Sequence, residues 1–542
     1  MEAKFDLCTE PWILLRRGVE VEALSLLGTL RDAHAYDALA GELPTQDAAI
    51  LRILLAVLYA VFTRFDPEKG AFAEIGDGDV AVARWRALWA LKRFPVGAVT
   101  RYLDRWKDRF WLFHADTPFL QTAGIRADER YKPVAQMVAH VPSREERRFF
   151  TERSGDAAQS LSFAEAARWL VHLQAWDYAG KKASVEGGSP DGRGGGTGWC
   201  GKLGLVYPTG KNLFETLMLN LVLADASGRP LRFGAPTWED AREKEAAVAK
   251  RERIPQGYAE LLTWRSRRVR LFPDAGGDRV IGVVSSYGDI FKKENTFIEQ
   301  MSGWHMSAQG GKDHIPNTHV ASRAFWRDLG ALLPQSKDEN PDGKRKRIRP
   351  GVLDWIARID AIDGLVNLCA VGYEYGAMQA IVNELISDSV ALNAKLLKAL
   401  DAAWQKSILD LIADTEQAVG ALGRLAADLD RAAGGDGTGA GNESKEQAYF
   451  ALDEPFREWL VKIDPDNSSL PEARNVWKRT ARRIVRKIGA AWIAKAGDVA
   501  FVGRNTEKAG HLRGYSVSAS ANMKFEAELN RIFGGIQKDG RC

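Results

Sequence analysis

The sequence predicts an α+β protein, in which a mixed α/β amino-terminal domain at residues 1–371 is followed by an antiparallel four-helix bundle at residues 372–542. Three observations predict this division. The chain has 542 residues, too many for one ordinary core. Its first part alternates strand-like and helical segments. After Gly372 long amphipathic segments follow, two of them joined by a glycine-rich turn, which is typical of an antiparallel bundle.

Composition indicates an ordinary folded protein. Apolar residues make up 45% of the chain, charged residues 27%, and the net charge is only +4, so any nucleic-acid surface must be a local patch. The four cysteines form no CxxC pair, which argues against a zinc ribbon or a disulfide framework. The longest apolar run, residues 53–62, is too short for a membrane span, and no signal-peptide pattern opens the chain. We therefore expect a cytoplasmic protein with no metal, cofactor or membrane contact.

The first elements of the amino-terminal domain are a hairpin and a core helix. The segment FDLCTEPWILL, at residues 5–15, is expected to pair with the strand after the turn Arg16-Arg17-Gly18, with Trp12 as its buried anchor. Pro44-Thr45-Gln46-Asp47 begins an apolar helix that continues to Phe62 and supplies the core. Further helices are expected at residues 80–91, 97–109 and 161–175.

An antiparallel pair of strands is predicted within residues 263–291, around a turn at residues 274–277. The first strand carries four arginines within six residues, which places positive charge on both faces and is typical of a solvated edge strand. These arginines are Arg265, Arg267, Arg268 and Arg270. Lys292 and Lys293 follow the second strand directly.

Four long helices are predicted for the second domain, at residues 378–433, 445–461, 471–496 and 519–533. Within the third, residues 474–488 carry seven basic side chains and no acidic one. Its apolar stripe is expected to be Trp477, Ala481, Ile484 and Ile488, with Lys478, Arg479, Arg482, Arg483 and Arg486 beside it. One face therefore packs while the rest is positive. Such a helix suits a phosphate backbone, although protein partners also use surfaces of this kind.

A glycine-dense segment precedes the apolar run at residues 210–223. Ten of the 25 residues from Gly180 to Gly204 are glycine, which fits either a flexible surface loop or backbone that lies against a ligand. Residues 196–202 have the glycine and lysine spacing of a phosphate-binding loop. However, Leu203 stands where such a loop needs Ser or Thr, and no buried strand precedes it. A nucleotide- or metal-dependent nucleic-acid enzyme that uses residues 196–202 remains the alternative function.

No motif for bond breaking is found. The chain has neither HExxH nor GxSxG, and Cys369 lies in an apolar run where a thiol is inert. His305, His314 and His319 match no metal-ligand spacing. The adjacent Phe149 and Phe150 lie in a charged segment and cannot both face one core, so they mark either a helix end with one ring buried or a loop that inserts an aromatic into a partner.

Several motifs, in order, resemble the CasA family, the large subunits of the type I-E CRISPR surveillance complexes called Cascade. The resemblance covers most of the chain and rests on the ordered set, since each motif alone is modest. The motifs are FDLCTEPWILL at residues 5–15, DTPFLQT at 116–122, LVHLQAWDYAGKK at 170–182, GKNLFETLMLNLVL at 210–223, TWRSRRVRL at 263–271 and GYEYGAMQA at 372–380.

The resemblance implies a non-catalytic subunit that binds DNA and RNA and serves antiviral defence. Such subunits inspect duplex DNA for a short protospacer-adjacent motif (PAM) from the minor groove and help to start the R-loop. Sequence specificity beyond the PAM belongs to the guide RNA. The implied partners are double-stranded DNA with a PAM, the Cascade subunits that hold the crRNA, and a helicase-nuclease.

The resemblance also implies the residues that recognise the PAM. The family's lysine finger matches Lys293, eleven residues before Trp304, with Lys292 as the near alternative. Its glycine loop matches Tyr178-Ala179-Gly180-Lys181, where this chain has one glycine instead of several. Its glutamine wedge matches Gln379 with Ala380, expected at the start of the first bundle helix. Contacts to the DNA backbone are expected from Lys181, Lys182, Arg479, Arg482, Arg483 and Arg486, and complex docking from Phe149 and Phe150.

Overall fold

A computed structural model describes residues 3–126, 131–141, 159–186, 195–240, 252–307, 313–334, 347–508 and 511–534, with residues 151, 153 and 155. The chain forms two compact units. The first comprises Met1–Arg323, Asn340–Ile362 and Val366–Ser389, and the second comprises Ala324–Glu339, Asp363–Leu365 and Val390–Cys542. Residues 372–389, which we expected in the second domain, cluster with the first unit because they form strands of its sheet.

The predicted hairpin and core helix are confirmed. β1 (Ile13–Arg17) pairs with β2 (Glu20–Leu24), and the buried Trp12 donates its indole N–H to the carbonyl oxygen of Leu7 at 2.9 Å. α2 (Pro44–Phe62) begins at its proline, and every residue except Pro44 and Asp47 is buried. A helix that is apolar all round must be covered on all sides. α2 is also long and apolar enough to cross a membrane, but 94% of its most apolar window is buried inside the protein, as in a core helix.

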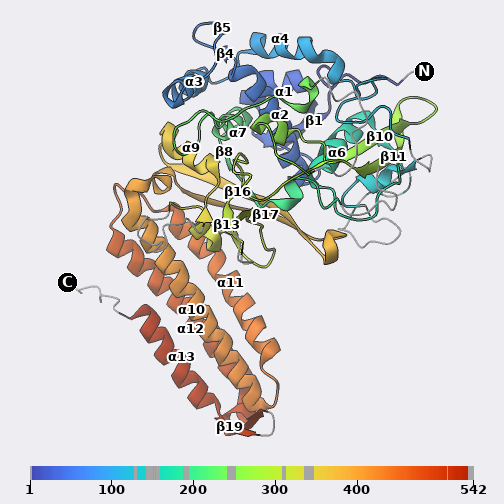
Figure 1. The fold of residues 1–542 in the computed structure, drawn as a ribbon. Coiled ribbons are helices and arrows are strands. Elements are labelled where there is room, and N and C mark those ends of the chain that lie inside the picture. The colour runs from blue at the N-terminus through green and yellow to red at the C-terminus, as the bar shows by residue number, and fades with distance from the viewer. Residues whose placement is uncertain are drawn as a thin grey trace. The chain divides into compact units, whose positions relative to one another are not determined.

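Further helices of the first unit pack against α2 or against one another (Figure 1). They are α1 (Leu26–Asp32), α3 (Gly78–Ala90), α4 (Val96–Trp106), α6 (Phe163–Trp176), α7 (Leu213–Asn220), α8 (Tyr258–Leu262) and α9 (Gly351–Ile359). α6 begins at a capping box, in which Ser162 and Glu165 each bond the other's backbone N–H. This cap fixes where α6 starts and therefore where its carboxyl end delivers the next loop.

Small sheets complete the first unit. β3 (Ala38–Leu39) joins β1, and β4 (Phe65–Asp66) pairs with β5 (Ala71–Phe72). β9 (Glu252–Arg253) pairs with β12 (Ile290–Phe291), while β13 (Trp304–Met306) lies between β14 (His314–Pro316) and β15 (Arg347–Ile348). β11 (Arg279–Tyr287) pairs with β6 (Lys132–Pro133), β7 (Leu161–Ser162) and β10 (Arg267–Pro273).

The pairing of β10 with β11 is confirmed, but the expectation of solvated arginines is wrong. Arg265, which precedes β10, and Arg270 are half-buried and donate to backbone carbonyl oxygens. Arg267 and Arg268 are only 1% and 3% exposed. A buried guanidinium requires partners, and Arg267 finds them in the loop that follows α6. β10 is nevertheless an edge strand of its sheet.

A second correction concerns residues 378–393, which we expected to be helical. β16 (Leu365–Tyr375) and β17 (Val382–Asn393) form a hairpin, and β8 (Leu205–Thr209) pairs antiparallel with β16. Gln379 therefore lies at a hairpin tip and not at a helix start. The sequence IVNELISDSVALN alternates sufficiently to form a strand, and pairing with β16 decides between the two structures.

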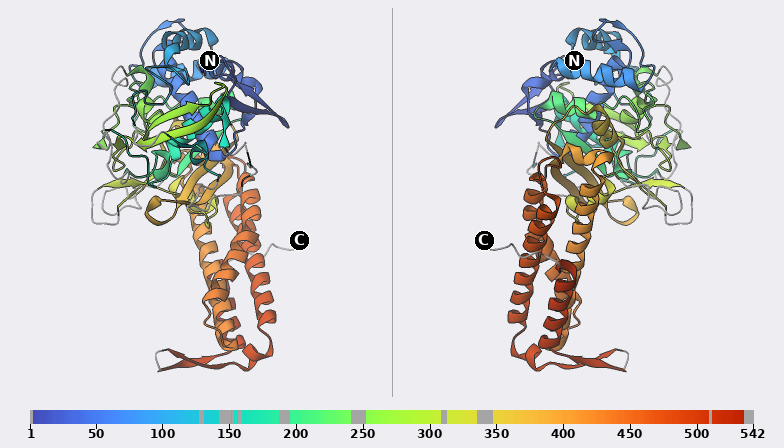
Figure 2. Two further views of the ribbon diagram at one scale, coloured as in Figure 1. Left: turned by 90° about the vertical axis from the view of Figure 1, so that its right-hand side faces the viewer. Right: turned by 90° about the vertical axis from the view of Figure 1, so that its left-hand side faces the viewer.

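The second unit contains the antiparallel four-helix bundle, as predicted (Figure 2). Its helices are α10 (Ala402–Ala433), α11 (Thr438–Val461), α12 (Leu470–Val502) and α13 (Ser518–Phe533). α10 ends at Gly434, whose φ of 109° suits glycine. At the core, the buried Trp477 donates its indole N–H to Thr415 Oγ1 at 3.0 Å and lies against the rings of Phe456 and Trp459. A hairpin of β18 (Arg504–Lys508) and β19 (His511–Ser516) projects from one end of the bundle.

Candidate nucleic-acid interface

The loop after α6, residues 177–182, is held by a cluster of buried charges. Arg267 Nε lies 2.6 Å from Asp177 Oδ2, and Lys182 Nζ lies 2.8 Å from the same oxygen. Arg267 also donates to the backbone carbonyl oxygens of Asp177, Tyr178 and Gly196, at 2.8–3.2 Å. Burial opposes ionisation of Asp177, but the two cations outweigh it and hold the pKa of this carboxyl below its usual value. The cluster therefore fixes the path of the loop backbone.

Aromatic side chains hold the same loop from other sides. The hydroxyl of Tyr287 lies 2.8 Å from the carbonyl oxygens of both Ala179 and Gly180. Lys182 Nζ lies 3.8 Å from the ring centre of Tyr178. A Cβ atom on Gly180 would lie 2.2 Å from the Tyr178 ring, so only glycine fits this turn. The single glycine of the loop is thus a packing requirement, and Lys181 remains exposed beside it.

The tip of the β16–β17 hairpin, residues 376–381, has an unusual backbone. Met378 and Gln379 both have positive φ, 53° and 57°. This left-handed region is unfavourable for residues other than glycine. The tip is closed by a hydrogen bond from the N–H of Gly376 to the carbonyl oxygen of Ile381, at 3.0 Å. Met378 and Gln379 are both exposed, whereas Ala380 is half-buried.

The hairpin tip and the loop are bonded to each other. The N–H of Ala179 donates to the carbonyl oxygen of Gln379 at 2.7 Å. At the base of the tip, the hydroxyl of Tyr375 donates to the carbonyl oxygen of Trp176, the last residue of α6, at 2.6 Å. The predicted glycine loop and the predicted wedge, far apart in sequence, thus form one connected surface.

Lys292 and Lys293 follow β12 and are both exposed. Behind them, Lys202 Nζ donates to the carbonyl oxygen of Phe291 at 3.2 Å. Burial, together with the positive charges of Arg267 and Lys293, lowers the pKa of Lys202 to about 8. Lys202 is therefore close enough to the arginine that holds the loop and to the predicted lysine finger for both charges to act on it. We call residues 177–182, 376–381 and 292–293 the recognition surface.

Residues 196–202 are the support of this surface and do not form a phosphate-binding loop. The N–H of Gly198 donates to the carbonyl oxygen of Asp177 at 2.8 Å, and the N–H of Trp199 donates to Ser266 Oγ at 3.1 Å. The next amides close a 3-10 turn, so they do not point at an anion as the amides of a phosphate cradle must. A Cβ atom on Gly201 would lie 2.5 Å from the Tyr375 hydroxyl. The glycines here allow close packing beneath the hairpin.

The predicted basic helix lies in α12, and its buried line differs from the expected stripe. Trp477, Ala481 and Val485 are fully buried, whereas Ile484 and Ile488 are both only half-buried. Part of its cationic face serves the bundle itself: Arg486 Nε pairs with Glu526 of α13 at 2.7 Å, and Arg482 bonds Asn530. Arg479 and Arg483 are exposed.

Other predicted positions contribute no site in the described part of the structure. Phe149 and Phe150 lie outside the described residues. His305 Nδ1 bonds Asn317 Oδ1 at 2.7 Å, and His319 Nε2 lies 3.0 Å from the carbonyl oxygen of Leu205. In the part of the chain that the structure describes, no group of three or more His, Cys, Asp or Glu side chains is placed to hold a metal ion. Burial raises the pKa of the Cys200 thiol to about 11, which makes it a poor nucleophile.

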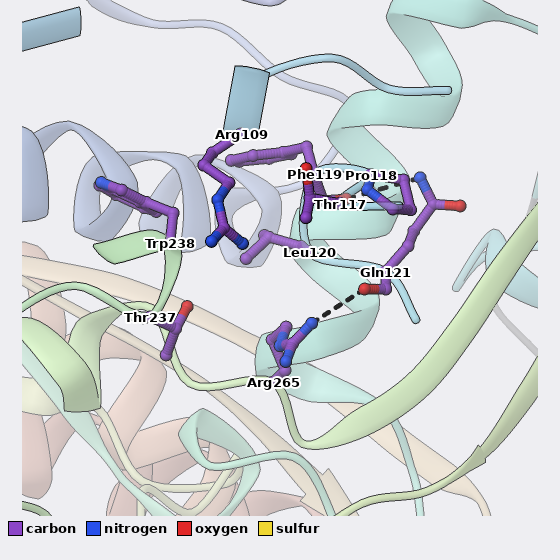
Figure 3. A pocket seen from close by; sticks show the side chains of 9 residues that line it. All are labelled: Arg109, Thr117, Pro118, Phe119, Leu120, Gln121, Thr237, Trp238 and Arg265. Atoms are coloured by element: carbon purple, nitrogen blue, oxygen red, sulfur yellow. Dashed lines mark hydrogen bonds between the residues drawn. The ribbon is translucent and has the colours of Figure 1, made fainter. Parts of the chain in front are cut away.

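A small hollow in the first unit is lined by nine residues (Figure 3). It encloses about 20 Å³, room for roughly one water molecule. Arg109 and Arg265 point toward it from opposite sides, and Arg265 donates to the carbonyl oxygen of Gln121 at 2.8 Å. Its volume is far below that of a small-molecule site. This hollow is therefore too small for a ligand, whereas a wider one of about 400 Å³ lies against α3 and Arg358 of α9.

Sequence reasoning missed the side chains that hold the recognition surface. Arg267, Asp177 and Tyr375 all lie within the family motifs, but their contacts join residues 90 and 199 positions apart. The signal available in the sequence was the arginine run itself, because four arginines within six residues require explanation.

Comparisons with known proteins identify relatives of this chain. A family model described as CRISPR-associated protein Cse1 matches residues 6–488. The CasA/Cse1 protein of Thermus thermophilus is 30% identical over 336 residues, a match that spans 61% of this chain and 61% of that relative. The crystal structure of Thermobifida fusca Cse1 matches with a TM-score of 0.84 and 32% identity over 98% of both chains.

One further match concerns an assembly. A chain of a CRISPR RNA-guided surveillance complex matches with a TM-score of 0.61 and 20% identity, over 91% of this chain and 99% of that one. At this identity the likeness shows the fold alone. These matches confirm both the resemblance that the sequence motifs indicated and the α+β fold with its carboxy-terminal bundle.

Proposed function

Because the chain belongs to the CRISPR-associated protein Cse1 family, we propose that it is a non-catalytic DNA-recognition subunit of a crRNA-guided surveillance complex of type I-E. In this proposal it recognises a PAM in duplex DNA from the minor groove, helps to start R-loop formation and recruits a helicase-nuclease for antiviral defence. Recruitment is proposed from family membership alone, without assigned residues. The DNA-recognition role rests on the recognition surface.

One observation carries the proposal: an exposed glutamine on a strained hairpin tip is bonded directly to a loop that an internal ion cluster holds rigid. Strained backbone persists where the surrounding structure enforces it, and such positions are concentrated at binding sites. The preorganised arrangement means that little conformational entropy is lost when DNA binds. The two exposed lysines of this surface, Lys292 and Lys293, supply positive charge.

The chemistry of these groups suits the minor groove. Lysine ammonium groups and backbone amides can bond the N3 and O2 acceptors there, which distinguish A·T from G·C but little else. We therefore propose that Lys293 contacts base edges, Lys181 contacts phosphate, and Gln379 with Ala380 slides beneath the last PAM base pair. Because the groove pattern is degenerate, several PAM sequences should be tolerated.

The structure changes the role that we propose for Lys182. Its side chain is 7% exposed and pairs with Asp177, so it holds the loop in place. Arg479 and Arg483 of α12 remain candidates for contacts to the DNA backbone, and Arg482 and Arg486 share such a role with their contacts to α13. The alternative enzyme hypothesis loses support, because the amides of Gly198, Trp199, Gly201 and Lys202 bond the protein itself.

The test measures binding of PAM-bearing and PAM-scrambled duplexes to the guide-loaded complex at fixed salt. Wild-type chain should prefer the PAM duplex, and Lys293→Ala and Gln379→Gly should each lose about tenfold or more of that preference. Gln379→Gly removes the amide without adding strain at a positive φ, whereas Gln379→Ala removes the amide and keeps the strain. Lys69→Ala, at an exposed lysine on the β4–β5 turn, serves as the control.

The results of this test distinguish an incorrect function from an incorrect assignment of residues. Loss of preference in both variants and not in the control supports the function and the residues. Discrimination that survives both substitutions would leave the function in place and refute the residue assignment. A wild-type complex without PAM preference would refute the function itself.

A further inference from the structure

Met378 has an unusual combination of properties. Its side chain is 90% exposed, more than that of Met523 at 70%, whereas Met137, Met218 and Met301 are at most 2% exposed. Its backbone lies in the left-handed region, with φ 53° and ψ 20°. The protein thus keeps an apolar side chain in water, on a backbone conformation that costs free energy for any residue except glycine. The hydrogen bonds of the turn hold this backbone conformation in place, but the side chain stays exposed, which points to a ligand that covers it.

We propose that the side chain of Met378 inserts between stacked base pairs of the bound duplex, as an apolar wedge beside Gln379. The inference rests on the proposed function, because it requires that the recognition surface binds DNA. Proteins that bend DNA from the minor groove insert apolar side chains, methionine among them, into base steps. Methionine suits this task because its unbranched, polarisable thioether adapts to an irregular gap.

The turn that carries Met378 is held firmly enough for insertion. Hydrogen bonds within the tip run from the N–H of Gln379 to the carbonyl of Gly376 and from the N–H of Ala380 to the carbonyl of Ala377, at 2.9 and 3.1 Å. The carbonyl of Gln379 is in turn bonded by the loop at Ala179. Met378 therefore projects from a closed turn that is fastened on one side. Because the backbone of this turn is rigid, contact with DNA can push the side chain between the base pairs without displacing the turn.

Met378 and Gln379 have different roles in this proposal because their side chains differ in chemistry. The amide of Gln379 can donate to and accept from base edges, which positions the tip. The thioether of Met378 offers no strong hydrogen bond, so it gains most by replacing a base in the stack. Ile381, 39% exposed at the other end of the tip, extends the apolar surface behind it.

The experiment follows base unstacking directly. Guide-loaded complex is mixed with a PAM duplex that carries 2-aminopurine in the first base pair beyond the PAM, and the fluorescence rise reports loss of stacking. Met378→Ala removes the wedge but keeps the same backbone strain, since alanine also disfavours positive φ. Met378→Leu restores apolar volume, and Met378→Gln keeps length without apolar character. Met523→Ala, at a second strongly exposed methionine in α13, is the control.

We expect Met378→Ala and Met378→Gln to slow unstacking by about tenfold, because an apolar side chain of this size no longer fills the opened step. Initial PAM binding, measured with a duplex locked against opening by interstrand crosslinking, should change less than about twofold, since the base-edge contacts of Gln379 and Lys293 remain. Met378→Leu and Met523→Ala should behave as wild type.

Two other outcomes overturn the inference at different levels. If Met378→Ala unstacks as fast as wild type while Gln379→Gly does not, the wedge is Gln379 alone and the proposed function stands. The same conclusion follows if Met378→Gln matches wild type. If the wild-type complex binds PAM and scrambled duplexes equally, both the inference and the function on which it rests are refuted.

Discussion

Replacing Asp177 by asparagine should loosen the recognition loop without disturbing the rest of the first unit. The carboxylate lies 2.6 Å from Arg267 and 2.8 Å from Lys182, and all three side chains are at most 7% exposed. Removing one partner of a buried ion pair costs about 3–5 kcal/mol. We take the lower value, about 3 kcal/mol, because Arg267 keeps its three carbonyl acceptors.

A change of this size is measurable by native-state hydrogen exchange. Each 1.4 kcal/mol is a factor of about ten in an equilibrium constant, so the loop should open about a hundred times more often. The amides of Ala179 and Ala183, which bond the carbonyls of Gln379 and Ser285, should exchange faster by that factor. Asp32→Asn breaks the exposed pair with Arg31 and should change exchange by less than about fivefold.

The protonation state of Asp177 adds a second check. Its pKa lies below the usual 3.8, so the folded loop binds this proton more weakly than the unfolded chain. The stabilisation is therefore complete above pH 3.8 and is lost only as the pH falls through the lowered value. Protection factors at Ala179 should agree at about pH 5 and about pH 7. Loop exchange in Asp177→Asn within twofold of wild type would refute the argument that this cluster holds the loop.

Three further predictions concern other parts of the chain. The pKa of Lys202 falls from 10.5 to about 8 on folding, so the folded state binds this proton less tightly than the unfolded chain. The free energy of unfolding should therefore rise between about pH 8 and 10.5. Lys202→Met should abolish that rise in thermal unfolding measurements, and an unchanged pH profile would contradict this prediction. Trp477→Ala should destabilise the bundle by about 3–5 kcal/mol in urea titrations followed by far-UV circular dichroism, because its ring is fully buried and bonds Thr415, whereas the exposed Val476→Ala should change it little. Combined charge reversal at Arg479 and Arg483 should weaken DNA binding and flatten its dependence on salt concentration, and an identical salt slope would exclude these residues from the DNA contact.

The sequence predicted the elements whose structure depends on local pattern. α2 followed from a proline and an unbroken apolar run, and the bundle followed from helical spacing and glycine turns. The helix expected from residue 378 failed because pairing with β16, a tertiary contact, decides the structure of that segment. Likewise, Arg267 could not be assigned as buried, since its partner Asp177 lies 90 residues away.

The candidate site shows the same limit. Family resemblance supplied Ala179, Lys293 and Gln379 as separate positions, and the structure showed that Ala179 and Gln379 are bonded. The strained tip and the ion cluster depend on three-dimensional contacts and have no signature in residue spacing. Sequence therefore indicates which residues carry the chemistry, while the structure indicates what holds them in place.

The discontinuous first unit has a consequence for how the chain acquires its structure during synthesis. β8 pairs with β16 across 158 residues, and in the core Thr45 Oγ1 lies 2.9 Å from the Tyr373 hydroxyl across 328 residues. Folding slows as contacts become more distant in sequence. The apolar surface of the core helix α2 therefore stays exposed during synthesis until β16 and β17 leave the ribosome. The bundle, built from neighbouring helices, closes soon after its own synthesis. Chaperone dependence should consequently be concentrated in the first unit.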